Sequence, residues 1–214
     1  MSGLTLSPEQ IGIGMRIGIH PHSDDYERII LEALETTSDQ LDLTGLEITT
    51  GEVSTYVGVK TGAAAQQLAD YATTLIASAS RASNRQHLTS HLLFSRGCPG
   101  EATCELLPGE IPVEQTVALE KTGLEAAAAW SLYPLADDGS AHMDPIYAAI
   151  GQAKASGITV TSEHYATILR GDLADVLTVV LNAWAKVGED VPHVVSHLAV
   201  SLDSPSAQRQ GDAA

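Results

Sequence analysis

The sequence predicts an α+β fold built from two copies of one small unit, each with the element order β-α-β-β-α-β. The first observation behind this prediction is a nine-residue pattern that occurs twice. His87–Ser95 lies over His193–Ser201 without a gap, and five of the nine positions are identical. The second observation is that His20–Asp25 lies over Tyr133–Asp138, where a proline and both aspartates recur.

A third match joins the two patterns. Thr55–Gly62 lies over His164–Gly171, with only the tyrosine and the last glycine identical. Because the three matches come in the same order in both halves, we interpret the chain as a tandem duplication, although the period is longer than that of solenoid repeats.

Each predicted unit begins with a strand and a helix. Met15–His20 and Ala127–Tyr133 are short apolar runs that end at an x-Pro turn, which is typical of strands. Asp24 and Asp25 can cap the helix that follows in the first half. Apolar residues at helical spacing support both first helices: Ile29, Ile30, Ala33 and Leu34 in the first half, and Ile146, Ala149, Ile150 and Ala153 before Gly157 in the second.

A hairpin, a second helix and a last strand complete each unit. The hairpins are predicted at Leu46–Thr50 with Val53–Lys60 and at Ile158–Ser162 with His164–Arg170. The second helices, Ala63–Ser80 and Asp172–Lys186, carry apolar residues at i, i+3 and i+4. The last strand of each unit is the nine-residue pattern.

These elements divide the chain into a first ferredoxin-like repeat at 14–97, a linker at 98–124, a second ferredoxin-like repeat at 125–203 and a tail at 204–214. Such a unit places its helices on one face of the sheet and leaves the other face bare. We expect the bare face to be covered, either because the two repeats stack face to face or because a second copy of the chain supplies the cover.

Composition narrows the function classes. The 214 residues are 44% hydrophobic and carry a net charge of −16, which disfavours nucleic acid as a partner. A cationic ligand would be favoured, although acidity is also a common route to solubility. The first ten residues lack the features of a signal peptide, and no run is long and apolar enough to span a membrane, so we expect a cytoplasmic protein.

The residues alone do not mark a catalytic or metal site. His87 and His91, like His193 and His197, are four apart, but no acidic ligand stands at a fixed spacing from both pairs. There is no Gly-x-Ser-x-Gly elbow and no phosphate loop. The paired aspartates at 24–25 and 137–138 could act as general acids or bases, yet aspartate is common at helix starts. We therefore expect no enzyme, no metal and no cofactor, but a binding module.

The same segments resemble the YkoF family of thiamine- and hydroxymethylpyrimidine-binding proteins. The resemblance runs from about Gly14 to Ser206. Its carriers are His20-Pro21-x-x-Asp24-Asp25-Tyr26, Val53-Ser54-Thr55, His87–Ser95 with Gly97-Cys98-Pro99-Gly100-Glu101, Tyr133-Pro134, His164-Tyr165-Ala166-Thr167 with Leu169-Arg170-Gly171, and His193–Ser206.

The resemblance implies two ferredoxin-like domains in each chain and a homodimer with stacked sheets. It also implies one ligand site per repeat and a non-catalytic role in the salvage or uptake of thiamine or its hydroxymethylpyrimidine precursor, beside a membrane transporter. The ligand-binding residues that it indicates are His20, Asp24, Ser54, Thr55, Tyr56, Cys98, Tyr133, Asp137, His164, Tyr165 and Thr167.

Two departures from the family pattern separate the repeats. A hydroxyl is expected four residues before the glycine that ends the hairpin; Thr167 supplies it in the second repeat, whereas Gly58 stands there in the first. Either the turn of the first hairpin is two residues longer, or the first site has changed. In addition, His20 precedes the proline in the first repeat and Tyr133 does so in the second. The sites are therefore expected to be unequal.

Two other classes of function stay open. One is a small ferredoxin-like enzyme that uses histidine and aspartate in the same cavity. The other is an ACT-like small-molecule sensor whose output depends on a partner. Against the enzyme, neither repeat carries a complete, duplicated acid/base set. Against the sensor, the sequence contains no output domain.

Overall fold

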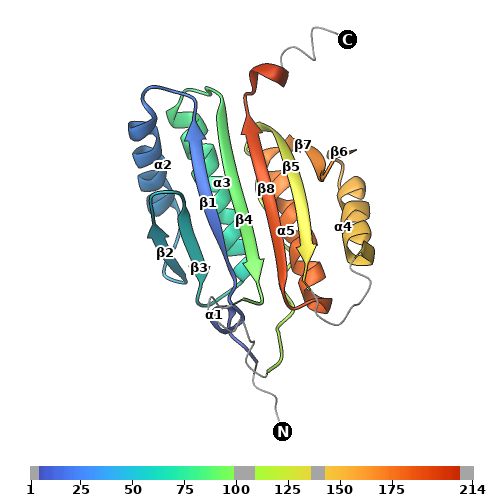
Figure 1. Ribbon diagram of the computed structural model, residues 1–214. Helices are drawn as coiled ribbons and strands as arrows, with labels where there is room; N and C mark the ends of the chain where they lie inside the picture. Colours follow the sequence, from blue (N-terminus) through green and yellow to red (C-terminus); the bar gives the residue numbers. More distant parts are fainter. Residues whose placement is uncertain (1–4, 99–108, 136–142, 208–214) are drawn as a thin grey trace.

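The computed structural model describes residues 5–98, 109–135 and 143–207. A single eight-stranded sheet runs through the molecule in the strand order β2-β3-β1-β4-β8-β5-β7-β6, and every pair of neighbours is antiparallel. The fold is therefore mixed α+β with an antiparallel sheet, and its helices lie behind the sheet in Figure 1.

The first half contains a short leading helix and six further elements. Their bounds are α1 Pro8–Ile11, β1 Gly14–Pro21, α2 Tyr26–Gln40, β2 Leu46–Thr50, β3 Thr55–Val59, α3 Ala64–Ala82 and β4 Leu88–Arg96. The second half has β5 Glu125–Pro134, α4 Met143–Ala155, β6 Thr159–Glu163, β7 Ala166–Asp172, α5 Leu173–Asp190 and β8 Val194–Leu202. From β1 and from β5 onwards, the order of elements is the same.

The two halves meet through the nine-residue pattern. β4 pairs antiparallel with β8, and Leu92 lies directly opposite Leu198, the residue that matches it in the sequence. The expectation that the halves of one chain stack face to face is therefore wrong. Two strands of the same sequence type pair edge to edge because both present unpaired backbone groups, and pairing removes two open edges at once.

The core lies between the sheet and its helices. Alternate residues of each central strand point toward α3 and α5, and those of β4 and β8 are buried without exception. α3 and α5 pack on the centre of the sheet with small and branched residues, while α2 and α4 cover its two outer parts (Figure 1). Among the described residues, α2 to α5 all lie on one side of the sheet, and the opposite, open face has none of these four helices over it (Figure 1).

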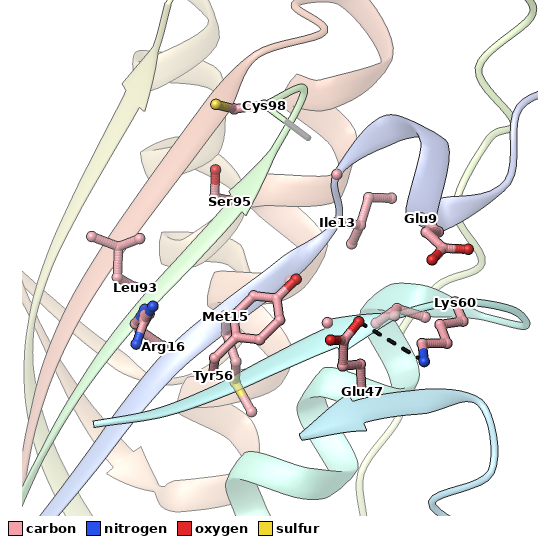
Figure 2. A pocket seen from close by; sticks show the side chains of 14 residues that line it. Glu9, Ile13, Met15, Arg16, Glu47, Tyr56, Lys60, Leu93, Ser95 and Cys98 are labelled. Carbon is pink, nitrogen blue, oxygen red and sulfur yellow. Dashed lines mark ion pairs between the residues drawn. The ribbon is translucent and has the colours of Figure 1, made fainter. Parts of the chain in front are cut away.

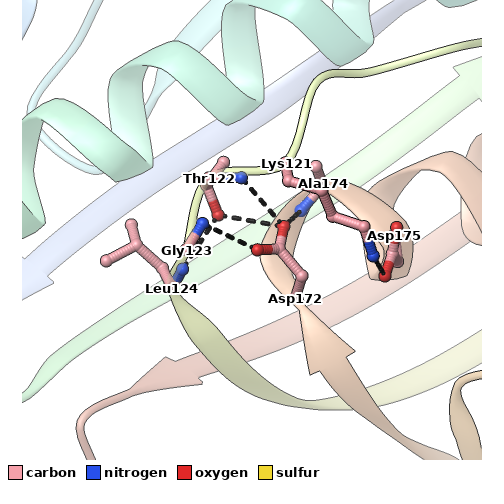
Figure 3. Close-up of polar contacts among 7 residues, drawn as sticks. All are labelled: Lys121, Thr122, Gly123, Leu124, Asp172, Ala174 and Asp175. Carbon is pink, nitrogen blue, oxygen red and sulfur yellow. Dashed lines mark hydrogen bonds and ion pairs between the residues drawn. The ribbon is translucent and has the colours of Figure 1, made fainter.

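Asp172 ties the segment before β5 to the start of α5. Its carboxylate accepts hydrogen bonds from the backbone N–H groups of Gly123 at 2.7 Å, Ala174 at 2.9 Å and Thr122 at 3.1 Å, and from the Thr122 hydroxyl at 3.0 Å (Figure 3). Burial opposes ionisation, but these hydrogen bonds outweigh it and lower the pKa of Asp172. The N-cap of α5 therefore also anchors the chain that enters the second half.

The helix caps of the first half differ from the prediction. Asp25 stands at the N-cap of α2, but its side chain makes no capping hydrogen bond and instead accepts one from Arg28 at 2.6 Å. The sequence analysis also missed α1, although Ser7 and Gln10 form a capping box around it.

Candidate functional site

Two cavities occupy the same place in the two halves. Each lies where the first strand of a unit, the first helix and the hairpin meet, and their volumes are about 220 Å³ in the first half and 300 Å³ in the second. The first cavity is lined by Ile17, Gly18, Ile19, His20, Ile30, Leu34, Thr50, Gly51, Glu52, Val53, Ser54, Thr55 and Leu75. The second is lined by Trp130, Ser131, Leu132, Tyr133, Ile146, Ile150, Ser162, Glu163, Tyr165, Ala166 and Thr167.

Strand lengths create these cavities. The last pair between β1 and β3 is Ile17 with Thr55, yet β1 continues to Pro21 along β4. In the second half the last pair between β5 and β7 is Trp130 with Thr167, and β5 continues to Pro134 along β8. Beyond each pair the outer edge of the first strand has no strand partner, so its backbone groups are open to a ligand.

A buried threonine marks the inner end of each cavity. Thr55 and Thr167 are 7% and 8% exposed. Each faces the helices from the last pair between the first strand of its half and the hairpin. The Thr55 hydroxyl lies 3.1 Å from the hydroxyl of Thr50, its cross-strand partner. Ser162 is the corresponding partner of Thr167. Each cavity therefore combines a pair of hydroxyl side chains, and sequence reasoning missed Thr50 and Ser162 because the pairing is visible only once the register is known.

The register corrects the third sequence match. Thr55 corresponds to Thr167, so Tyr56 corresponds to Ile168 and not to Tyr165. The turns have the same length in the two halves, because Thr50 and Thr55, like Ser162 and Thr167, are paired and five residues apart; the second hairpin has one more pair, Glu163 with Ala166. A longer turn therefore does not explain the glycine at position 58, which corresponds to Arg170 and not to Thr167.

The walls of the two cavities differ. The apolar side chains of Ile30 and Leu34 on α2 form one wall of the first cavity, and Ile146 and Ile150 on α4 form that of the second. In the second cavity the indole of Trp130 replaces Ile17 and donates a hydrogen bond to the hydroxyl of the buried Ser196 at 3.0 Å. The second site thus offers a rigid aromatic surface that the first lacks.

His20 and Tyr133 stand at equivalent mouths of the two cavities. His20 is exposed and Tyr133 is 48% exposed. The His20 ring lies 5.7 Å from that of His91, and burial, His91 and His22 lower the pKa of His20, in that order of importance. His20 is thus held toward its neutral form, in which it can both donate and accept a hydrogen bond.

The remaining predicted residues are spread over several places. Ser54 lines the first cavity. Asp24 lies on an exposed acidic groove along α2, away from it. His164 is exposed in the β6–β7 turn and does not line the second cavity. Tyr165 borders that cavity, but its side chain is 98% exposed, and its carbonyl oxygen accepts a hydrogen bond from Ser131 at 3.2 Å. Asp137 lies outside the described residues.

Carboxylates reach the cavities from residues that the sequence analysis did not single out. Glu52 lies in the turn between β2 and β3, and Glu163 ends β6; each borders the cavity of its half. Both residues are exposed. They make the mouth of each cavity acidic.

Tyr56 and Cys98 belong to a different hollow. They line a cavity of about 400 Å³ on the face of the sheet without helices, together with residues of α1, β1 and β4 (Figure 2). Tyr56 points to that face because side chains alternate along a strand and its neighbours Thr55 and Val57 face the helices. The prediction that Tyr56 lies beside Thr55 in one ligand site is therefore wrong.

The fold defines a mixed α+β protein with an antiparallel sheet and a similar cavity in each half. The family model described as YKOF-related Family matches residues 125–207. Over 199 residues the chain is 28% identical to "Putative HMP/thiamine-binding protein YkoF" of Bacillus subtilis, covering 92% of this chain and 93% of that protein. These matches confirm the resemblance: the chain is related to the YkoF family.

Two solved structures were also matched. A hypothetical protein from Methanocaldococcus jannascii has a TM-score of 0.34 and 30% identity, covering 36% of this chain and 77% of its own. A "putative thiamine biosynthesis/salvage protein" from Thermotoga maritima has a TM-score of 0.33 and 16% identity, covering 36% and 81%.

The described residues contain neither a candidate membrane-spanning helix nor a candidate metal site. No helix in the described ranges is long and apolar enough to cross a membrane. Within the same ranges, no group of three or more histidine, cysteine, aspartate and glutamate side chains is arranged to hold a metal ion.

Proposed function

We propose that the chain binds thiamine or hydroxymethylpyrimidine, one molecule in each half, without transforming it. The observation that carries the proposal is the pair of cavities built around Thr55 and Thr167 at the same register position. The relative from Bacillus subtilis, whose name states binding of these compounds, supports the ligand class.

The chemistry of each cavity suits an aminopyrimidine. Its ring needs an apolar wall, which Ile30 and Leu34 or Trp130 provide, and its polar edge needs hydrogen-bonding groups. The hydroxyls of Thr55 and Thr167 and the strand edges beyond them supply these groups. A thiazolium ring would then extend toward the acidic mouth, where a cation is favoured in a chain with a net charge of −16.

Binding without catalysis is supported by the unequal titratable groups. The first cavity is bordered by His20 and Glu52, and the second by Tyr133, Tyr165 and Glu163. A duplicated enzyme would need a comparable acid and base in each site. The alternative of a ferredoxin-like enzyme predicts turnover of the bound compound that is lost in His20→Asn, whereas our proposal predicts no product by mass spectrometry.

We further propose that the chain is a tandem repeat and that a second copy covers the centre of the open face of the sheet, leaving the hollow around Tyr56 uncovered. The central strip of that face lies on β4, β8 and β5, and its side chains on β4 and β8 are histidine and small or apolar residues. On β5 there is no charged residue between Ala127 and Tyr133. Small side chains allow a second sheet to approach closely, and an open sheet face without a layer over it favours association.

The proposed cytoplasmic location and transporter partner of the chain follow from the proposed ligand. A non-catalytic binder of thiamine or its precursor would serve salvage or uptake in the cytoplasm, beside a membrane transporter that delivers the compound. Cross-linking in cells followed by mass spectrometry tests this part, and the expected result is a ligand-dependent contact with a membrane protein. Binding in vitro with no such contact would reject the transporter partner alone.

Isothermal titration calorimetry tests the ligand proposal directly. Thiamine and hydroxymethylpyrimidine are titrated separately into the purified chain, with thymine as a control that lacks the aminopyrimidine edge. We expect a stoichiometry of two per chain with unequal affinities. No heat from either compound at millimolar concentration would overturn the proposal.

A further inference from the structure

The hollow on the open face of the sheet is a binding site of its own. It lies between α1, β1, β3 and β4, and it shares no residue with the cavity around Thr55. We propose that it binds small ring compounds that carry one anionic group, either a carboxylate or a phosphate monoester. The proposal is independent of the ligand assigned to the paired cavities.

Two glycines make the floor of this hollow. Gly14 and Gly58 lie opposite each other on β1 and β3. A Cβ atom at Gly14 would lie 2.8 Å from the carbonyl oxygen of Val57, and one at Gly58 would lie 2.4 Å from the hydroxyl oxygen of Tyr56. The Tyr56 side chain therefore lies along its strand over Gly58, in the space that a Cβ atom would fill, and the glycines let its ring lie close against the backbone at the floor of the hollow.

Arg16 supplies the positive charge. It is the cross-strand partner of Tyr56, it is exposed, and its guanidinium carbon lies 5.7 Å from the centre of the Tyr56 ring. Among the described residues Arg16 has no ion-pair partner, whereas the charge of Lys60 is compensated by Glu47 at 3.9 Å. The other carboxylate of the hollow, Glu9, lies at its α1 end, across the hollow from Arg16 (Figure 2). An arginine without a carboxylate partner is suited to bind a planar anion with two parallel hydrogen bonds.

The remaining walls fit a ring with an anionic substituent. Leu93, which is 40% exposed, lies opposite Arg16 on β4, and the Ser95 side chain stands two residues further along the same face (Figure 2). A ring can contact Tyr56 and Leu93 while its anionic group meets Arg16 and the Ser95 hydroxyl. Burial and Glu47 raise the pKa of Tyr56, so the phenol stays neutral and does not repel the anion.

Chemical-shift titrations by NMR test the proposal with three probes of similar size: phenyl phosphate, benzoate and neutral benzyl alcohol. We expect either anion to shift the resonances of Arg16, Tyr56 and Gly58, and benzyl alcohol to bind at least tenfold more weakly. Tighter binding of phenyl phosphate would identify a phosphate monoester as the preferred group, and tighter binding of benzoate a carboxylate; both results support the proposal.

Three variants locate the effect. Arg16→Gln is expected to weaken binding of the anion at least tenfold, and Tyr56→Leu is expected to reduce it by removing the ring. Arg170→Gln is the matched control, since Arg170 is exposed on β7 at the register position that corresponds to Gly58. Equal affinity in Arg16→Gln and the unchanged chain, or shifts confined to residues around Thr55 and Thr167, would overturn the proposal.

Discussion

Thr55 and Thr167 occupy the same position in the two halves of the chain, each buried and each at the last pair between the first strand of its half and the hairpin. Tyr56 and Tyr165, the identical residues that first aligned the hairpins, do not correspond. The hydroxyl and its cross-strand hydroxyl partner are thus kept although the residues between them differ, which is the arrangement expected if the hydroxyl has a role in both sites.

Ligand entry into the second cavity should be visible in tryptophan fluorescence. The chain has two tryptophans, and Trp130 lines the second cavity whereas Trp184 is buried against Phe94 and donates a hydrogen bond to the carbonyl of Val194 at 3.1 Å. We expect hydroxymethylpyrimidine to change the emission of the chain and of Trp184→Phe. A change that survives in Trp130→Phe would place the ligand elsewhere.

The proposed covering of the open face can be tested with Ala199, which lies on β8 opposite His91. Ala199→Glu places a charge at the centre of the face, and burying an unpaired carboxylate there is costly, so we expect sedimentation velocity to show a dimer for the unchanged chain and a monomer for the variant. Leu31→Glu is the control, because Leu31 is 59% exposed on α2 at the other side of the molecule. A dimer that withstands Ala199→Glu would contradict the proposed interface.

The Asp172 carboxylate should stabilise the fold in a pH-dependent way. The two carboxylate oxygens of Asp172 accept from the N–H groups of Thr122 and Gly123, and Asp172→Asn replaces one of these oxygens with an NH2 group that cannot accept. We expect a loss of about 1 kcal/mol in the free energy of unfolding at pH 7. Because the folded pKa is lowered, the contribution is present above the ordinary pKa of about 3.9 and is lost as the pH falls through the folded value.

Urea unfolding at pH 7 and pH 3 measures this contribution. The difference between the unchanged chain and Asp172→Asn should be larger at pH 7 and should narrow at pH 3. Asp24→Asn, at an exposed position before α2, should be neutral at both. A difference that grows on acidification would reject the role assigned to the charge.

His20 should make the protein less stable in mild acid. Its pKa is lowered in the folded state, so the unfolded chain binds the proton more tightly and the free energy of unfolding falls as the pH drops below the ordinary value of 6.5. His20→Asn should therefore show a smaller loss of stability between pH 7.5 and pH 5.5 than the unchanged chain. If urea denaturation gives the same change in the free energy of unfolding between the two pH values for the variant and the unchanged chain, His20 does not contribute to the pH dependence.

Sequence reasoning predicted most elements of the fold because their signals are local. Leu46–Thr50 was predicted with the bounds that β2 has, and the nine-residue patterns contain all but the last residue of β4 and of β8. The pairing of β4 with β8 could not be predicted, since a strand with unpaired edges can join any other, and only the assembled fold decides which edge it meets.

The candidate site was predicted only in part, and the reason is register. Residue identity aligned Tyr56 with Tyr165, but the pairing makes Thr55 equivalent to Thr167, so Tyr56, one residue further along its strand, faces the open side of the sheet. Thr50 and Ser162 were missed because a cross-strand partner is not a neighbour in the sequence. Thr55 and Thr167 were both among the residues that the family resemblance indicated, but the sequence match placed Thr55 over His164 and Gly58 over Thr167, so their equivalence was missed.

The stoichiometry of hydroxymethylpyrimidine binding in the threonine variants tests the account most directly. Valine is nearly isosteric with threonine, so Thr55→Val and Thr167→Val remove a hydroxyl and little else, while Thr49→Val on the open face serves as the control. Calorimetry should give two molecules per chain for the unchanged protein and for the control, one for each single variant and none for the double variant. Two molecules per chain in the double variant would contradict the assignment of the paired cavities as the ligand sites.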